Sequence, residues 1–209
     1  AELAKESYLK KYPIKVINNG INLKIFKPTT GNFKERYKIS EDKNIILSVS
    51  FEWGYRKGLD CIIRLAEMLG ENYQVVVVGT DDKVDKQLPN NILSIHRTQN
   101  QKELAEIYSV ANVFVNPTRE EVLGMVNIES LACGTPVVMF QTGGSPECVD
   151  EKSGIVVEKN KTEAMFKTII QICEQKLFDE KDCVTRAKKF DESKKYHEYI
   201  ELYLSSVER

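Results

Sequence analysis

The sequence has few of the residues from which several classes of active site are built. It contains two histidines, His96 and His197, so a serine–histidine–aspartate relay or a histidine-rich metal site has few candidates, and we expect structural roles for both. The five cysteines include no C-x-x-C pair, which disfavours a disulfide framework or a zinc knuckle and favours a reducing cytoplasm. No apolar run approaches the roughly 18 residues that a membrane-spanning helix needs, and the first residues lack the apolar core of a secretory signal.

Charge of one sign is not in excess either. Lys and Arg total 30 and Asp and Glu total 31, for a formal net charge of −1, so the electrostatic basis for a dedicated nucleic-acid binder is missing. With 42% hydrophobic residues, the chain of 209 residues can bury one sizeable core and at most two. Because no repeat, low-complexity stretch or Pro/Gly-rich linker divides it, we expect residues 1–209 to form a single domain.

Short apolar runs alternate with helical patterns along most of the chain. The run QVVVVG is apolar on both faces, as a central parallel strand covered by helices requires. The sequence therefore predicts the α/β class, with a doubly wound parallel sheet and helices on both of its faces. Strands are expected at residues 14–17, 44–49, 73–78, 91–95, 113–115, 136–140 and 154–157.

The two ends of the chain read as helical. Residues 1–13 begin with a helical pattern that leads into the domain. After residue 157 the strands stop, and amphipathic, lysine-rich helices are expected at residues 161–176, 179–189 and 192–207. We interpret their charges as solvated helix faces rather than as an interaction tail.

The usual phosphate-binding and metal-binding signatures are missing. There is no G-x-G-x-x-G and no G-K-[ST], and the only adjacent glycines are Gly143 and Gly144. Asp81, Asp82 and Asp85 do not form a D-x-D motif, so a metal-dependent nucleotide site is disfavoured. A phosphate would then be bound by backbone N–H groups at helix starts and by a few basic side chains, at the carboxyl ends of the strands.

The most informative stretch is NPTREEVLGMVNIESLACGTPVV, residues 116–138. It predicts a polar loop over residues 116–124 and a helix over residues 125–133, with Glu121 in the loop and Glu129 inside the apolar helix. A carboxylate there is costly unless something donates to it. A ribose diol could donate two hydrogen bonds, and free N–H groups at the helix start could hold a diphosphate beside it. On spacing alone, Glu129 could equally cap a neighbouring loop or pair with a lysine.

This stretch, with TGGSPECV after it, resembles the E-x7-E block of the retaining, group 1 (family 4-like) glycosyltransferases, which have the two-domain GT-B fold. Residues 15–28, KVINNGINLKIFKP, resemble that family's segment between the two domains, and SVSFEWGYRKGLD, residues 48–60, its lysine-bearing strand, loop and helix. QKELAEIYSVANVFVNPT, residues 101–118, matches the helix and strand that lead into the glutamate loop. The resemblance covers about residues 15–157 and is closest to transferases of bacterial surface-polysaccharide (capsule) biosynthesis.

The resemblance implies that this chain is the Rossmann-like, C-terminal, donor-binding half of a longer enzyme. Residues 1–13 would be an interdomain helix or linker, residues 161–209 the C-terminal helices, and the N-terminal acceptor domain would be absent. It also assigns roles to residues. The implied catalytic residues are Glu121, which would contact the donor sugar, and Lys57 and Arg56, which would bind the diphosphate. The implied donor-binding residues are Glu129, which would bind the ribose, and Arg97, which would contact the base, together with the loop residues Gly124, Met125 and Val126.

One position departs from the family pattern. Many relatives carry an arginine five residues before the lysine, where this chain has Glu52. Arg56, immediately before the lysine, can fill that role if its side chain turns into the cleft, and simple surface exposure is the equal alternative. Trp53 is expected to be partly buried under the same loop, and the glycine pair at Gly143 is expected to serve mainly as a tight turn.

The resemblance also implies the reaction. It is transfer of a hexose-type sugar from a nucleoside-diphosphate sugar to a glycan or lipid-linked acceptor, with retention, in the cytoplasm and with peripheral contact at the inner membrane through the missing domain. No cofactor or metal is expected, because Arg56, Lys57 and helix N–H groups would stabilise the leaving diphosphate. The isolated chain is expected to be inactive. The alternative is a non-catalytic nucleotide-sugar-binding module; an epimerase of this fold fits poorly, since only His96 could supply its cleft histidine.

Overall fold

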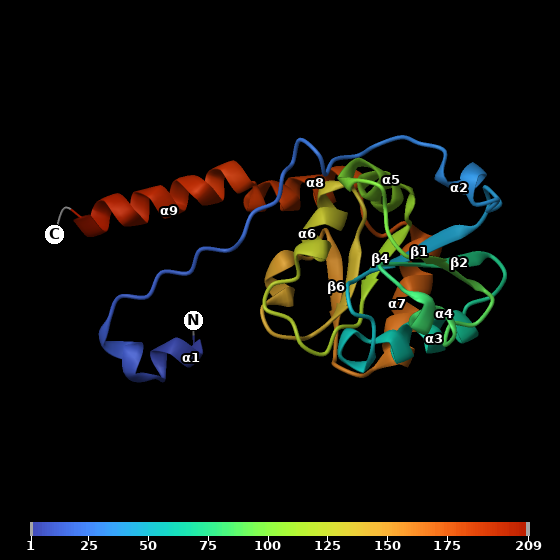
Figure 1. The fold of residues 1–209 in the computed structure, drawn as a ribbon, viewed down its shortest axis with the longest axis horizontal. Helices are drawn as coiled ribbons and strands as arrows, with labels where there is room; N and C mark the ends of the chain where they lie inside the picture. The colour runs from blue at the N-terminus through green and yellow to red at the C-terminus, as the bar shows by residue number, and fades with distance from the viewer. Residues whose placement is uncertain (1, 208–209) are drawn as a thin grey trace.

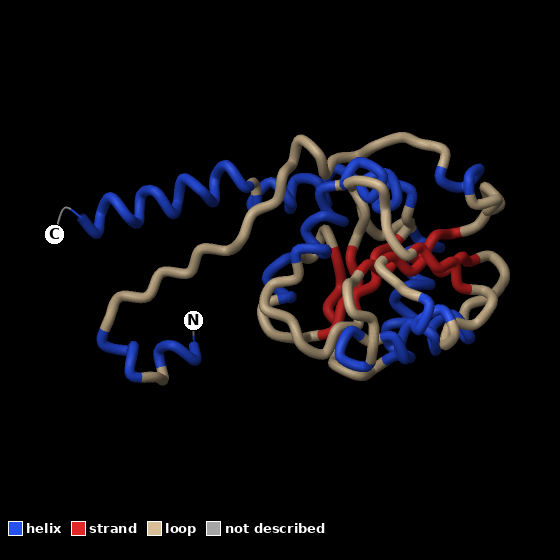
Figure 2. Tube along the Cα trace, in the orientation of Figure 1, coloured by secondary structure: helices blue, strands red, loops and turns tan. Residues whose placement is uncertain are grey.

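A parallel sheet forms the centre of the protein (Figures 1 and 2). Its six strands lie in the order β3-β2-β1-β4-β5-β6. The computed structural model describes residues 2–207. The α/β class and six of the seven expected strands are confirmed. The apolar runs of these strands are buried because the sheet is covered on both faces. The strands are β1 Asn44–Val49, β2 Tyr73–Val78, β3 Ile92–Ile95, β4 Val113–Asn116, β5 Val137–Phe140 and β6 Gly154–Val157.

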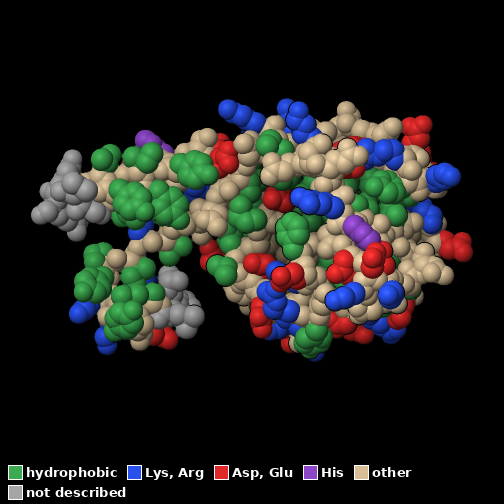
Figure 3. Space-filling model, viewed as in Figure 1, with side chains coloured by type: hydrophobic (Ala, Val, Ile, Leu, Met, Phe, Trp, Pro, Cys, Tyr) green, Lys and Arg blue, Asp and Glu red, His purple; other side chains and the backbone are tan. Residues whose placement is uncertain are grey.

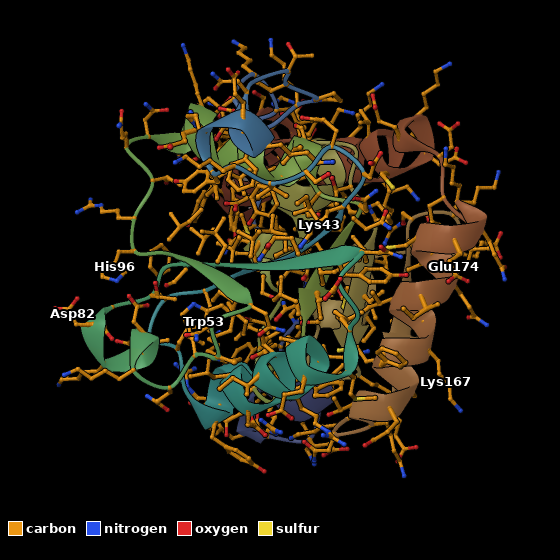
Figure 4. All side chains as sticks on the ribbon, turned by 90° about the vertical axis from the view of Figure 1, so that its right-hand side faces the viewer. Lys43, Trp53, Asp82, His96, Lys167 and Glu174 are labelled. Carbon is orange, nitrogen blue, oxygen red and sulfur yellow. The ribbon has the colours of Figure 1, made fainter. Side chains whose placement is uncertain are left out.

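Helices cover the two faces of the sheet and bury a separate apolar core on each (Figures 1 and 4). On one face lie α2 Phe33–Arg36, α5 Gln101–Val110, α6 Met125–Ala132 and α8 Glu180–Ala187. On the other face lie α3 Leu59–Met68 and α7 Thr162–Gln175. The remaining helices are α1 Glu2–Lys5, α4 Asp82–Asp85, α9 Glu192–Val207 and the 3-10 turns Tyr8–Lys11, Tyr55–Lys57, Ser145–Cys148 and Lys188–Phe190.

The expected strand at residues 14–17 is wrong. This segment is an extended loop in which Ile14 and Val16 are exposed, and it pairs with no strand in the part of the chain that the structure describes. Its β-branched residues have the right propensity, but it runs along α9 instead of along a sheet edge, with Tyr199 Oη donating to Ile17 O at 3.4 Å. The expected N-terminal helix is only α1 and one 3-10 turn. Residues 1, 208 and 209 lie outside the described residues.

The N-terminal segment and α9 leave the body of the protein together. They meet at a bridge between Ile21 and Asp191, where Ile21 N donates to Phe190 O at 2.8 Å and Glu192 N to Ile21 O at 3.0 Å. Figure 3 shows apolar side chains gathered on both projecting segments. Within residues 2–207, no helix combines the length and the apolar character that crossing a bilayer requires. We call the exposed apolar side chains of the N-terminal segment and α9 the tail face. Its members are Tyr8, Leu9, Tyr12, Ile14, Val16, Tyr196, Tyr199, Ile200, Tyr203 and Leu204.

The strand order places a crevice between β1 and β4. The chain passes from β1 to β2 and β3 on one side and returns to β4 on the other, so the loops that follow β1 and β4 diverge at the carboxyl edge of the sheet. Those loops are residues 50–58 and residues 117–124. They carry the lysine and the first glutamate of the expected site.

Candidate functional site

A cleft of about 690 Å³ opens at the carboxyl ends of β1, β2 and β4. Its size is within the range of about 300–1,000 Å³ that is usual for small-molecule sites. Gly124 lies buried one residue before Met125, at the start of α6, and is not itself a lining residue. The other expected site residues all line the cleft: Arg56, Lys57, Arg97, Glu121, Met125, Val126 and Glu129.

Lys57 and Glu121 form an ion pair inside the cleft. Lys57 Nζ donates to Glu121 Oε2 at 3.0 Å, and Glu121 Oε1 accepts the Val122 N–H at 3.0 Å. Their side chains are 18% and 21% exposed, so water screens the pair only in part. The Lys57–Glu121 pair thus joins the loop after β1 to the loop after β4 inside the cleft.

Arg56 both lines the cleft and is half exposed. Its Nη2 lies 3.5 Å from Glu52 Oε2, and Glu52 adopts a left-handed backbone with φ of 56°. Glu52, at the position where the resemblance predicts an arginine, therefore pairs with the arginine that could take over that role. Both carboxylate and guanidinium are open to solvent, so the pair contributes little and a diphosphate could displace it.

Glu129 is held by a tyrosine. Tyr108 Oη donates to Glu129 Oε2 at 3.0 Å, and Tyr108 is fully buried in α5. The sequence left two other roles open for Glu129, pairing with a lysine and capping a neighbouring loop. Within residues 2–207, no lysine pairs with Glu129 and the Glu129 side chain caps no loop. Burial raises the pKa of the Glu129 carboxyl, and the Tyr108 hydrogen bond opposes that rise.

The start of α6 is open to a ligand. Gly124 precedes the helix with φ of +83°, and among residues 2–207 no side chain caps it. A Cβ at Gly124 would lie 2.5 Å from Asn127 Nδ2, and Asn127 Oδ1 in turn accepts from Asn116 Nδ2 at 2.8 Å. The buried asparagine pair therefore fixes the first turn of α6 against the end of β4, and the N–H groups of that turn lie beside the cleft.

The expected turn at TGG is confirmed. Gly143 has φ of +52°, and a Cβ there would clash with the carbonyl oxygen of Glu121. Gly144 N donates to Val122 O at 2.9 Å, so the turn supports the glutamate loop. Trp53 is half-buried as expected, with Nε1 donating to Val78 O at 2.9 Å (Figure 4).

The loop after β3 supplies the far wall of the cleft. Arg97 is exposed there, and the preceding His96 binds Asp85 with an Nε2–Oδ2 distance of 2.7 Å. That hydrogen bond raises the pKa of His96, and hydrogen bonds from Ser94 and then His96 lower the pKa of Asp85. Figure 4 shows His96 and Asp82 at the same edge of the molecule. Asp82, Asp85 and His96 lie close enough for one cation, but both Asp85 oxygens already accept hydrogen bonds.

Four functional candidates were missed by the sequence reasoning: Tyr108, Asn116, Asn127 and Arg119. Each acts through a contact between distant positions, which periodicity does not reveal. The signal for the two asparagines and Arg119 was their place within the polar loop and first helical turn of residues 116–127. Tyr108 gave none, because it fits the apolar face of α5.

Fold and site together define a Rossmann-like α/β domain, with a cleft at the topological switch point that is lined by both basic and acidic side chains. The family model for glycosyl transferases group 1 matches residues 30–190. The chain belongs to this family, as the resemblance implied.

Curated relatives agree with this assignment. The D-inositol 3-phosphate glycosyltransferase of Streptosporangium roseum is 31% identical over 166 residues, covering 69% of this chain and 38% of that protein. The capsular polysaccharide biosynthesis glycosyltransferase CapM of Staphylococcus aureus is 28% identical over 177 residues, covering 78% of this chain and 44% of that protein. The chain thus spans less than half the length of these relatives.

Solved structures share the fold. Sucrose-phosphate synthase from Thermosynechococcus elongatus superimposes with a TM-score of 0.84 at 24% identity, over 99% of this chain and 56% of that one. Anabaena HepE, solved in complex with UDP-glucose, gives a TM-score of 0.80 at 17% identity, over 91% of this chain and 57% of that one. The expected class, a Rossmann-like sheet of the GT-B type that ends in helices, is confirmed.

Proposed function

We propose that this chain is the donor-binding half of a retaining glycosyltransferase. The enzyme would transfer a hexose-type sugar from a nucleoside-diphosphate sugar to a glycan or lipid-linked acceptor in polysaccharide biosynthesis. The observation that carries the proposal is the Lys57–Glu121 pair at 3.0 Å, set in the cleft beside Glu129 and the uncapped start of α6. Cations and free N–H groups suit a diphosphate, and carboxylates suit sugar hydroxyls.

Lys57 would be the main ligand of the diphosphate. As the donor binds, its phosphate oxygens replace Glu121 at Nζ, which releases a Glu121 oxygen to accept from hydroxyls of the sugar. When the bond between sugar and phosphate breaks, negative charge grows on the leaving diphosphate, and Lys57, Arg56 and the first turn of α6 stabilise it. Removing one such preorganised donor typically lowers kcat by about 10²–10³. These positive groups support catalysis without a metal ion.

Glu129 would bind the nucleoside. Its carboxylate lines the cleft and receives one hydrogen bond from Tyr108, which leaves it acceptor capacity for the two hydroxyls of a ribose. Arg97 lies on the wall formed by the loop after β3 and would stack on the base. Backbone atoms of Gly124, Met125 and Val126 would contact the phosphates and the sugar.

The acceptor would bind mainly to a half of the enzyme that this chain does not contain. The chain covers 56% and 57% of the two solved structures, so each of them has room for a second domain outside the matched part. In the longer protein, residues 1–13 would link the two halves, and the tail face would pack against the N-terminal half. We place the reaction in the cytoplasm, which suits the five unpaired cysteines, with contact at the inner membrane through the missing half.

Calorimetric titration tests the roles of the two glutamates. A thermal-shift screen first selects among ADP, GDP, UDP and their hexose conjugates. Glu129→Gln should then weaken the selected diphosphate and its conjugate alike, by about 1.5–3 kcal/mol, the range for a hydrogen bond to a charged group. Glu121→Gln should weaken only the conjugate. Glu120→Gln, an exposed neighbour, is the control.

Two results would contradict the assignment. One is an equal loss for both ligands in Glu121→Gln, and the other is no loss in a folded Glu129→Gln. A non-catalytic sugar-nucleotide-binding module would give the same binding results, and it is separated by product formation in the full-length protein.

A further inference from the structure

Arg119 is a buried cation two positions before Glu121. Its side chain is only 10% exposed. Nη1 donates to Asp60 Oδ1 at 2.7 Å and to Tyr55 O at 2.6 Å, and Nη2 donates to Asp60 Oδ2 at 2.9 Å. Nε donates to Asn160 Oδ1 at 2.7 Å, and the guanidinium lies 3.8 Å from the centroid of the Tyr55 ring.

The partners of Arg119 belong to three segments around the lysine of the cleft. Tyr55 begins the 3-10 turn that ends at Lys57, Asp60 lies in the first turn of α3, and Asn160 lies in the loop before α7. Arg119 thus reaches both ends of the short segment that carries Lys57. It is itself part of the loop that carries Glu121.

Backbone contacts join the same two loops. Arg119 N donates to Arg56 O at 2.9 Å. Gly58, with φ of +77°, packs so closely on Pro117 that a Cβ would clash with the Pro117 carbonyl oxygen. The Lys57 turn therefore rests on residues 117–119, and the Arg119 side chain reaches past this contact to the far side of the turn.

The chemistry of these contacts requires arginine. The planar guanidinium of Arg119 donates four hydrogen bonds in different directions, and two of them form a bidentate pair with the Asp60 carboxylate. A lysine ammonium is a compact point charge and cannot serve Asp60, Tyr55 and Asn160 together. Because four of its five N–H groups are engaged, Arg119 has little capacity left to bind a phosphate itself.

We propose that Arg119 is a positioning residue, which sets the Lys57 turn against the glutamate loop so that Lys57 Nζ and Glu121 Oε2 meet in the cleft. What the pair then does, binding the diphosphate and the sugar, rests on the proposed function. The positioning itself is a property of the unliganded protein. It can therefore be tested without any nucleotide.

The first test measures the reactivity of Lys57. Purified variants are acylated with a water-soluble N-hydroxysuccinimide ester, and the rate at Lys57 is compared by peptide mass spectrometry with that at Lys167, an exposed lysine on α7 (Figure 4). In Arg119→Lys and Arg119→Gln, Lys57 leaves Glu121 and its relative rate should rise roughly fivefold. The control is Arg64→Lys and Arg64→Gln, because Arg64 is an exposed arginine on α3 with one ion pair to Glu67 at 3.2 Å.

The second test separates positioning from a general loss of stability. Affinities of ADP, GDP and UDP are compared with those of the parent nucleosides, which lack the phosphates. Arg119→Lys should lower the affinity of the bound diphosphate about tenfold and leave its nucleoside unchanged. If Arg119 only stabilises the fold, both affinities fall together with the melting temperature.

Each outcome decides a separate question. An unchanged Lys57 rate in folded Arg119 variants overturns the positioning role. A raised rate in a protein that binds none of the nucleotides supports the positioning role and contradicts the proposed function. Should Arg119→Gln not fold, Asp60→Asn weakens the same bidentate pair from the exposed side, and it should raise the Lys57 rate by a smaller factor than Arg119→Lys.

Discussion

The buried carboxylate of Glu129 lowers the free energy of unfolding of the protein. Burial raises the pKa of its carboxyl above the ordinary value of 4.5, so the folded chain holds this proton at a pH where the unfolded chain has lost it. The free energy of unfolding therefore decreases as pH rises from the ordinary pKa to the raised one, and stays at the lower level above it.

Glu129→Gln should remove this pH-dependent cost. Glutamine has nearly the same volume, and its Oε1 can still accept from Tyr108, so the variant should gain stability relative to the native chain as pH rises above the ordinary carboxyl pKa of 4.5. Urea unfolding at several pH values measures the difference. A stability difference between Glu129→Gln and the native chain that stays constant with pH would contradict the effect of burial on Glu129.

Tyr108→Phe tests the partner of the same carboxylate. Phenylalanine fills the buried space but removes the hydrogen bond that favours the ionised form, so the pKa of Glu129 should rise further. Binding of the nucleoside diphosphate should then weaken, and its loss at low pH should begin at a higher pH than in the native protein. Titrations between about pH 5 and pH 8 measure this, with Tyr203→Phe on α9 as the exposed control. An identical pH profile would show that Tyr108 does not act through Glu129.

Among single residues, the sequence identified most of those that line the cleft and missed those that hold them in place. The motif gives the positions of Lys57 and Glu121, because the proposed diphosphate and sugar ligands would require those residue types. Their supports, Arg119 and Tyr108, are chosen by hydrogen bonds across 59 and 21 positions of the chain. Such pairing depends on the packed arrangement and leaves no local pattern.

Among the elements, α6 depends on the glycine that precedes it, Gly124. Gly124→Ala would put a side chain at φ of +83° and against Asn127, and a left-handed conformation costs a residue other than glycine about 1–2 kcal/mol. We expect a stability loss of that size and weaker diphosphate binding, because the N–H groups of the first turn would be displaced. Urea unfolding and calorimetry measure the two effects. Gly70→Ala is the matched control, since among the described residues no atom lies within 4 Å of the position that the added Cβ would take.

The positive groups around the start of α6 also predict how binding responds to a chelator. Lys57, Arg56 and the first turn of α6 supply the positive charge that a diphosphate needs, so EDTA should change its affinity less than about twofold. The measurement is a titration with and without EDTA. A large loss would indicate that a cation takes part, and the group of Asp82, Asp85 and His96 would be the first place to examine by substitution.

The elements themselves were largely predictable. Central strands such as β2 show continuous apolar runs that only a covered sheet can bury. Helix α9 begins at the expected residue because Asp191 caps its start, with Asp191 Oδ1 accepting from Ser193 N at 2.9 Å. The segment at residues 14–17 has the same propensity as a strand but no free sheet edge beside it. Whether a short apolar run becomes a strand depends on its neighbours, which the sequence does not specify.

At the level of the whole molecule, the prediction concerns which steps the 209-residue chain can carry out without a second half. We expect the 209-residue chain to fold, since both faces of its sheet are covered, and to bind a nucleoside diphosphate weakly. It should transfer no sugar, because the half proposed to hold the acceptor lies outside these 209 residues. Parallel assays of this chain and the full-length protein measure the difference. Turnover by the chain at a comparable rate would show that the acceptor site is already present.

The bridge between Ile21 and Asp191 has a consequence for evolution. Residues 21–191 begin and end at one point, so their two junctions with the rest of a protein coincide. A unit of that kind can be exchanged between proteins without matching any separation between its ends, because the recipient has to provide only one attachment point. Recombination at this bridge would move the entire cleft, with Lys57, Glu121 and Glu129 in their native geometry, into a new protein in a single event.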